Sequence, residues 1–150
     1  MRFLNSIDVS ASGLTAQRLK MDTIASNMAN VETTRVTGGQ GPYRRQVVVF
    51  EARQQKTHDP FHSVLENQIA TQGGVRIKEI RELSEAEAPY RKVYDPSHPD
   101  ADAEGYVNYP NVNIVEEMIN MISASRSYEA NVTSINATKS IALKALEIGR

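Results

Sequence analysis

The feature that most constrains the fold of this chain is a regular seam in its last quarter. Between residues 113 and 146 the spacing of the seam positions alternates between four and three residues without a break. Asn113 is a suitable N-cap with Glu116 placed as a capping-box partner, and no proline or glycine follows before Gly149. The pattern predicts one long C-terminal helix with its seam at Ile114, Met118, Met121, Ser125, Tyr128, Val132, Ile135, Lys139, Ala142 and Leu146.

A second seam of the same period runs along the start of the chain. Its positions are Leu4, Ile7, Ala11, Leu14, Arg18, Met21, Ala25 and Met28. The two seams predict a coiled-coil-like pair of terminal helices. The pair can form within one subunit or between subunits, and the sequence leaves the relative direction of the two helices open.

Neither seam is strongly apolar, because Arg18, Ser125 and Lys139 interrupt it. Both helices also carry apolar residues off the seam: Leu19, Ile24, Val31, Val115, Ile119, Ile122, Leu143 and Ile148. A second apolar stripe predicts a second neighbour. We therefore expect packing between subunits at Leu4, Ile7, Leu14, Met21, Met28, Ile114, Met118, Met121, Tyr128, Val132, Ile135 and Leu146. A buried helical hairpin in a monomer is the alternative interpretation.

The middle of the chain reads as a small β-rich module. Tyr43 to Phe50 is rich in aromatic and β-branched residues, and within it Val47 to Phe50 predicts a strand buried on more than one side. Val75 to Ile80 predicts a strand interrupted by a bulge. Short strands are expected at Arg91–Tyr94 and Gly105–Tyr109, with a solvated acidic loop between them. The predicted fold is mainly α with a small β-rich insert: an N-terminal helix in 1–33, a β-rich module in 34–111 and a long C-terminal helix in 112–150.

Composition excludes several classes of function. The formal net charge is -1 and the pI is near 6.3, which argues against a nucleic-acid partner. The absence of cysteine excludes disulfides, thiolate zinc sites and cysteine nucleophiles. The start of the chain lacks the basic and apolar regions of a cleavable signal peptide, and no apolar run has membrane-spanning length. We therefore expect no cleavable signal and no membrane insertion.

No set of residues predicts catalysis, a cofactor site or a metal site. His58 and His62 have a metal-ligand spacing, but Pro60 lies between them. Ser97 and His98 lie in the acidic loop, where a rigid catalytic triad is not expected. The glycines at 38, 39 and 41 lack the Lys and Ser/Thr of a phosphate loop and predict a turn. Arg44 and Arg45 are expected at a solvent edge or in a subunit contact.

Two segments carry a family resemblance. The first is SASGLTAQRLKMDTIASNMANVETT, in which Ala25 to Asn30 matches the phrase that ends the first helix of flagellar axial proteins. The second runs from Gly105 to Arg150, where Pro110-Asn111-Val112 leads into Glu117-Met118 and then Ser125 to Asn131. Together they cover about half of the chain. The chain resembles the flagellar axial and rod protein family, and its compact middle resembles that of the short proximal-rod members.

The resemblance implies a structural subunit, and no enzyme, of the bacterial flagellar basal-body rod. It implies export through the flagellar type III apparatus and polymerisation with copies of itself and other rod proteins. The tubular assembly would span the periplasm and transmit motor torque. Three alternatives remain: another short rod subunit, a soluble coiled-coil adaptor or secretion chaperone, and, as the least favoured, an enzyme.

Overall fold

The computed structural model describes residues 2–36, 41–53 and 73–149, with side chains from residue 5 onward. The elements are α1 (Arg2–Ala29), β1 (Gln46–Ala52), β2 (Val75–Glu82), β3 (Arg91–Tyr94), β4 (Tyr106–Tyr109) and α3 (Ile114–Ile148). The prediction of two long terminal helices with a small strand module between them is confirmed. Asn113 caps α3 as expected, since its Oδ1 accepts from the backbone N–H of Val115 at 3.0 Å.

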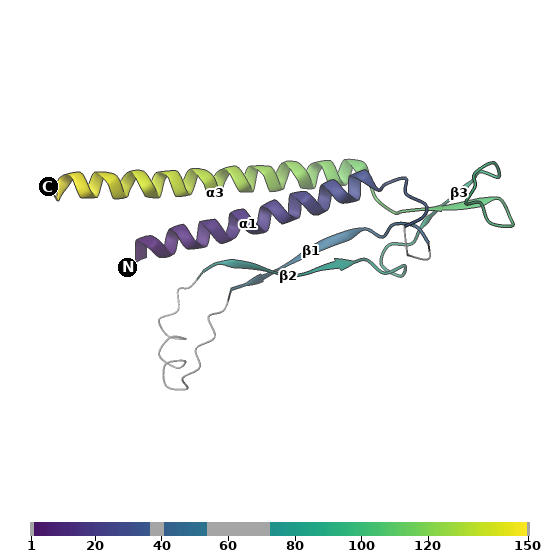
Figure 1. Cartoon of the computed structure of the whole chain (residues 1–150), viewed down its shortest axis with the longest axis horizontal. Coiled ribbons are helices and arrows are strands. Elements are labelled where there is room, and N and C mark those ends of the chain that lie inside the picture. The colour runs from purple at the N-terminus through teal and green to yellow at the C-terminus, as the bar shows by residue number, and fades with distance from the viewer. Residues whose placement is uncertain (1, 37–40, 54–72, 150) are drawn as a thin grey trace, which may run out of the picture.

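The two helices lie side by side and run in opposite directions, so that both chain ends lie at the same end of the molecule (Figure 1). The side chain of Asn27 meets Glu117, and the backbone of Gly13 lies against the side chain of Asn131. Moving fourteen residues back along α1 therefore moves the contact fourteen residues forward along α3. This settles the direction that the sequence left open.

The strands form two separate antiparallel hairpins, β1–β2 and β3–β4. The β1–β2 hairpin packs on α1 but not on α3 in the part of the chain that the structure describes, so α1 is the middle layer (Figure 1). The predicted bulge is confirmed, because the pairing passes from Glu79 to Ile77 and leaves Lys78 without a partner strand residue. The β3–β4 hairpin projects from the end of the molecule opposite the chain ends.

The core is thin, as expected for so small a module. The buried apolar residues among those described are Ala16, Ile24, Tyr43, Val107, Val112 and Ala124. The expectation that β1 is buried on more than one side is wrong. Val47, Val48 and Val49 are half-buried and Phe50 is exposed, because α1 covers only one face of a two-stranded sheet.

Candidate functional site

The face that α3 turns toward α1 differs from the predicted seam at every second position. Glu117 and Ala124 are the buried residues of α3, and Asn131 lies against Gly13. The contact positions therefore continue one residue before Met118, Ser125, Val132 and Lys139, while half-buried Met121, Tyr128, Ile135 and Ala142 belong to both series. The true contact face follows Glu117, Ala124, Asn131 and Thr138, whose small or polar side chains gave no apolar signal.

The predicted packing residues consequently fall into distinct environments. Ile114, Met118 and Leu146 are exposed, with 45%, 51% and 73% of their surface accessible. Half-buried positions are Ile7, Leu14, Met21, Met28, Met121, Tyr128, Val132 and Ile135, and the side chain of Leu4 lies outside those that the structure describes. The α1 members recur every seven residues and form one row along the helix.

Asn27 is the centre of a buried polar cluster at the end of α1. Its Nδ2 donates to the backbone carbonyl of Gln46 at 2.9 Å and to Oε2 of Glu117 at 3.3 Å. Its Oδ1 accepts from the backbone N–H of Gln46 and from the hydroxyl of Tyr43, both at 2.9 Å. With 1% of its surface exposed, Asn27 joins α1, α3 and the start of β1 in one set of hydrogen bonds.

Arg45 supplies the charge that Glu117 needs. Glu117 is 1% exposed, and its Oε1 accepts from Nε of Arg45 at 2.9 Å and from the Nη2 group of the same guanidinium. Nη2 also lies 3.2 Å from Oε1 of exposed Glu116. Burial lowers the pKa of Arg45. The two glutamates, Glu117 foremost, raise this pKa, and the net direction is upward. A buried carboxylate is thus paired instead of isolated.

The solvent edge expected for Arg44 and Arg45 is wrong for Arg45, and the capping-box role expected for Glu116 is wrong. Arg45 does not occupy a solvent edge, since its side chain is 20% exposed and bound to Glu117; Arg44 is exposed and donates to the hydroxyl of Tyr90. Glu116 binds Arg45 instead of reaching back to the cap. A seam that keeps Met121, Tyr128 and Ile135 but takes the residue before each of the other seam positions would have placed Glu117 at the helix contact.

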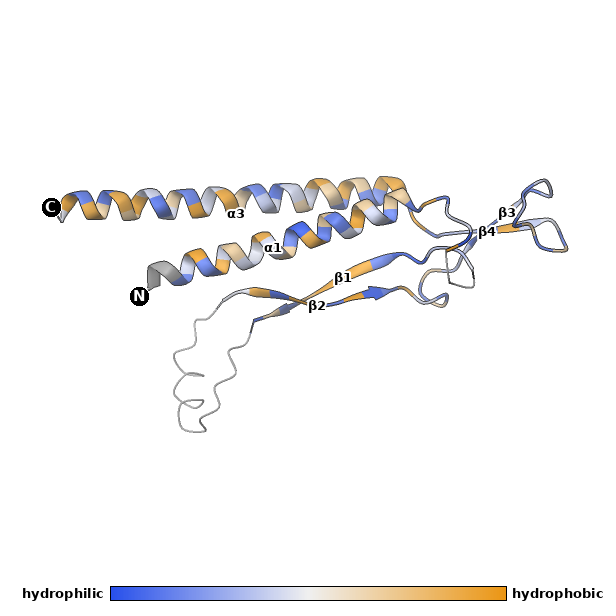
Figure 2. Cartoon of the chain, viewed as in Figure 1, coloured by the Kyte–Doolittle hydropathy of each residue, from blue (hydrophilic) through white to orange (hydrophobic). Residues whose placement is uncertain are grey.

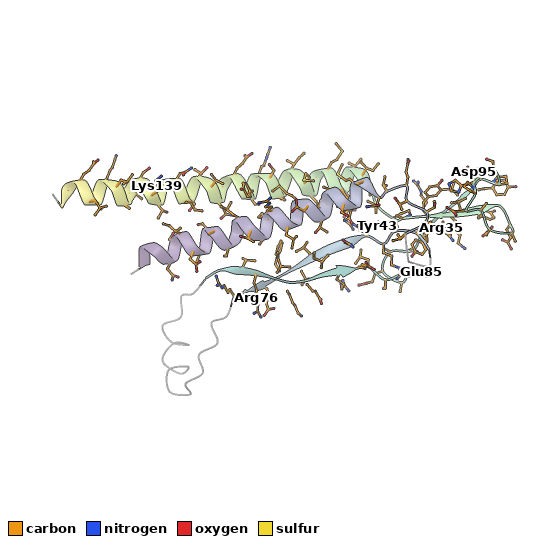
Figure 3. All side chains as sticks on the ribbon, in the orientation of Figure 1. Arg35, Tyr43, Arg76, Glu85, Asp95 and Lys139 are labelled. Atoms are coloured by element: carbon orange, nitrogen blue, oxygen red, sulfur yellow. The ribbon has the colours of Figure 1, made fainter. Side chains whose placement is uncertain are left out.

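Tyr43 closes the cluster where the end of α1 meets the approach to β1 (Figure 3). Its ring is buried, and its hydroxyl lies 3.4 Å from the hydroxyl of Ser26. Burial raises the pKa of the Tyr43 phenol, a side-chain hydrogen bond with Ser26 lowers it, and the charges of Glu82 and Glu117 raise it further. The net direction is upward, so the phenol remains a hydrogen-bond donor.

Exposed apolar residues gather near both ends of α3. The first α3 patch consists of Ile114, Val115, Met118, Ile119 and Ile122, and the second α3 patch of Ile141, Leu143, Leu146 and Ile148. Figure 2 shows hydrophobic residues at the two ends of the helix and a more polar stretch between them. Ile119, for example, is 62% exposed, and apolar groups gathered in this way are typical of interaction surfaces.

In the loop between β3 and β4, Ser97 and His98 form hydrogen bonds that stabilise local turns. The Ser97 hydroxyl donates to Oδ1 of Asp95 at 2.6 Å, while Nδ1 of His98 accepts from the backbone N–H of Asp100. Asp100 also binds Thr34 and Arg35, which ties the loop to the chain after α1. Hydrogen bonds from Ser97 lower the pKa of Asp95. Within the described chain no three His, Cys, Asp or Glu residues gather as a metal site; His58 and His62 lie outside it.

No helix within the described ranges combines the length and apolar character needed to cross a membrane. Two family models match the chain where the sequence resemblance lies. One, described as "Flagella basal body rod protein", matches residues 7–35, and the other, "Flagellar basal body rod FlgEFG protein C-terminal", matches residues 103–148. The first match contains Asn27 and the second contains Glu117.

Curated relatives extend the match over the whole chain. The flagellar basal-body rod protein FlgC of Bacillus subtilis is 46% identical, with 100% of both chains covered. The chain belongs to the FlgC family of flagellar basal-body rod proteins. FlgC of Borreliella burgdorferi is 48% identical over 99% of this chain and 98% of its own, and FlgC of Escherichia coli O6:H1 is 42% identical over 100% of both.

Membership of the FlgC family confirms the resemblance at the two ends of the chain. The relatives also match the compact middle, because they align with the chain over almost its whole length. FlgC is a structural rod family and not an enzyme family. The chain is accordingly a structural protein of the flagellar basal-body rod. The features that matter for such a protein are the contacts that join its helices and its exposed apolar surfaces.

Proposed function

We propose that this chain polymerises, with copies of itself and with other rod proteins, into the proximal part of the tubular rod that transmits motor torque. The single observation that carries the proposal is the exposure of α3. This helix is 35 residues long, yet Glu117 and Ala124 are its buried residues, and both of its outer patches are open. A helix so little covered by its own chain gains most of its packing from neighbours.

The α1–α3 pair would form the wall of the tube in coiled-coil-like contact, with neighbouring helices covering the two α3 patches. The rows Ile7, Leu14, Met21, Met28 and Met118, Val132 would contribute to the same packing. Contacts that join different surfaces of identical subunits do not close on themselves and generate helical assemblies. The β hairpins would brace the outside of this wall.

Export through the flagellar type III apparatus is part of the proposal. A chain without cysteine is compatible with passage in an unfolded state, and a thin core with two little-buried helices unfolds at low cost. The exported chain would then refold its α1–α3 pair, and neighbours would cover the two α3 patches in the part of the rod that spans the periplasm.

The test replaces one exposed apolar residue by a charge. Ile119→Glu places a carboxylate in the first α3 patch, where it is hydrated in the free chain and would be buried in an assembly. Thr133→Glu is the matched control, because Thr133 is exposed on the polar stretch of the same helix. We expect both variants to be secreted and only Ile119→Glu to leave cells without complete rods and without motility.

The measurement compares secreted subunit, isolated basal bodies and swimming for the two variants. Complete rods containing Ile119→Glu would contradict packing through the first α3 patch. A stable dimer of the purified chain, independent of concentration, would instead favour the adaptor alternative.

A further inference from the structure

One dipeptide of the middle module holds both terminal helices. The backbone N–H and carbonyl of Gln46 bond the side chain of Asn27 on α1, both at 2.9 Å. The preceding residue, Arg45, binds Glu117 on α3 through Nε at 2.9 Å. Asn27 and Glu117 also bond each other. All of these bonds can form together at only one position of α1 along α3.

The rest of the helix contact repeats every seven residues, so it distinguishes less sharply between positions one heptad apart. On α3 the contact face alternates between small or polar Ala124, Asn131 and Thr138 and half-buried Met121, Tyr128 and Ile135. Each set recurs every seven residues, so a shift by one heptad exchanges a small side chain for a small one and a large side chain for a large one. A shift of α3 by one heptad would bring Ala124 or Thr138 opposite Gly13 in place of Asn131. Either side chain is small enough to lie beside a glycine, so shape alone discriminates weakly between these registers.

We propose that the cluster of Asn27, Arg45 and Glu117 determines the register of α1 against α3, and that register, more than stability, is its role. A shift by one heptad would move Glu117 away from Asn27 and from the guanidinium of Arg45. Its carboxylate, 1% exposed in the present register, would then be buried without partners or would drag water into the contact. Buried polar residues in helix seams are known to select register in this way.

The inference concerns the folded single chain and does not depend on the proposed assembly. Its consequence is geometric. The β1–β2 hairpin is tied to α1, so the register of α3 decides how far the two α3 patches lie from the hairpin. A single register gives every copy the same distance between the α3 patches and the β1–β2 hairpin, which the proposed helical packing requires.

Disulfide trapping can measure the register, because the chain has no cysteine of its own. Gly13→Cys with Asn131→Cys reports the present register, since a Cβ at residue 13 lies 3.0 Å from Nδ2 of Asn131. Gly13→Cys with Thr138→Cys reports a shift of one heptad in one direction, and Gly13→Cys with Ala124→Cys reports the other. Each reporter pair is introduced into the full-length chain with the natural cluster and into one with an altered cluster. Both chains are oxidised, and the cross-linked fraction of one reporter pair is compared between the two.

The altered cluster is Asn27→Leu with Glu117→Leu, which removes the polar pair and keeps apolar bulk at the contact. Hydrogen bonds to charged groups are strong enough that we expect the shifted reporters to cross-link about tenfold more in this background, while circular dichroism retains the helix signal. Arg45→Met with Glu117→Gln is the second variant, because it removes the ion pair between these residues without leaving a buried charge.

Two results would overturn the proposal. The first is unchanged cross-linking of all three reporters in both variants with the helix signal retained, which would show that the cluster does not determine the register. The second is loss of the helix signal together with all cross-links in both variants, which would show that the cluster supplies stability instead of register.

Discussion

Gly13 lies directly against the side chain of Asn131, so close that a Cβ at residue 13 would be 3.0 Å from Nδ2 and 3.3 Å from Cγ of the asparagine. Nδ2 is itself held by a hydrogen bond to the backbone carbonyl of Ser127 at 3.0 Å. Glycine in the middle of a helix is otherwise unfavourable. Its presence here allows α1 and α3 to approach closely.

We expect Gly13→Ala to lower the free energy of unfolding by about 1 kcal/mol, since the tight contact outweighs the gain in helix propensity. In a chain that already carries Asn131→Ala, the same substitution should raise it by about 0.5–1 kcal/mol, because only the propensity gain remains. Urea unfolding of the four chains measures the coupling. A Gly13→Ala chain more stable than the natural one would contradict the close approach.

Glu117 and Glu116 provide a matched pair of variants, because both carboxylates bind the guanidinium of Arg45. Glu117→Gln leaves Arg45 without its buried partner and should lower the free energy of unfolding by about 2 kcal/mol or more. Glu116→Gln removes an exposed interaction and should cost about 0.5 kcal/mol or less. Equal effects in chemical denaturation would show that the burial of Glu117 contributes nothing.

The Tyr43 phenol should make the free energy of unfolding depend on pH. Burial raises its pKa, so the folded chain keeps the proton to a higher pH than the unfolded chain does. The stability that this provides is complete below a pH of about 10, where an unfolded tyrosine ionises, and is lost as the pH rises through the folded pKa. Tyr43→Phe should cost about 1 kcal/mol at neutral pH through the hydrogen bond to Asn27.

The difference in unfolding free energy between the natural chain and Tyr43→Phe should therefore shrink above a pH of about 10. Comparing the two chains cancels the titration of lysines and of the other tyrosines. A difference that stays constant across the alkaline range would show that Tyr43 does not hold its proton through burial.

Amide exchange should be fast along both helices of the free chain at micromolar concentration, from Leu4 to Met28 and from Ile114 to Leu146. The reason is that the helices bury few side chains of their own. Among the amides of the two helices, the slowest should lie beside Asn27 and Glu117, where the polar cluster joins three segments. Uniformly strong protection in a species shown to be monomeric would contradict this prediction.

Val132→Glu tests the flank of the helix pair. Val132 is half-buried beside Asn131, and a carboxylate there would be left without a partner once neighbouring subunits exclude water. We expect the variant to be exported but not incorporated, with truncated basal bodies and no motility. His98→Glu, in the loop at the opposite end, should be tolerated; normal rods from both variants would remove Val132 from the proposed interface.

The sequence predicted the elements well because local signals specify them. The long run without proline or glycine, the cap at Asn113 and the phase slip before Ile80 correspond to α3, its first turn and the bulge at Lys78. These features depend on neighbours along the chain. They require no knowledge of what lies across the helix.

The contact face of α3 could not be predicted in the same way. A search for apolar periodicity selects Met118 over Glu117, yet Met118 is 51% exposed and Glu117 is 1% exposed. The carboxylate is buried because Arg45, 72 residues away, reaches it. A partner so distant in sequence leaves no periodic signal, so the cluster became visible only in the folded chain.

The opposite directions of α1 and α3 also have an electrostatic consequence. The partial positive charge at the start of α3 lies beside the partial negative charge at the end of α1, because Glu117 and Asn27 meet there. The two helix macrodipoles therefore largely cancel within one chain. Copies aligned side by side would then carry almost no net dipole, so parallel neighbours would not repel one another through their helices.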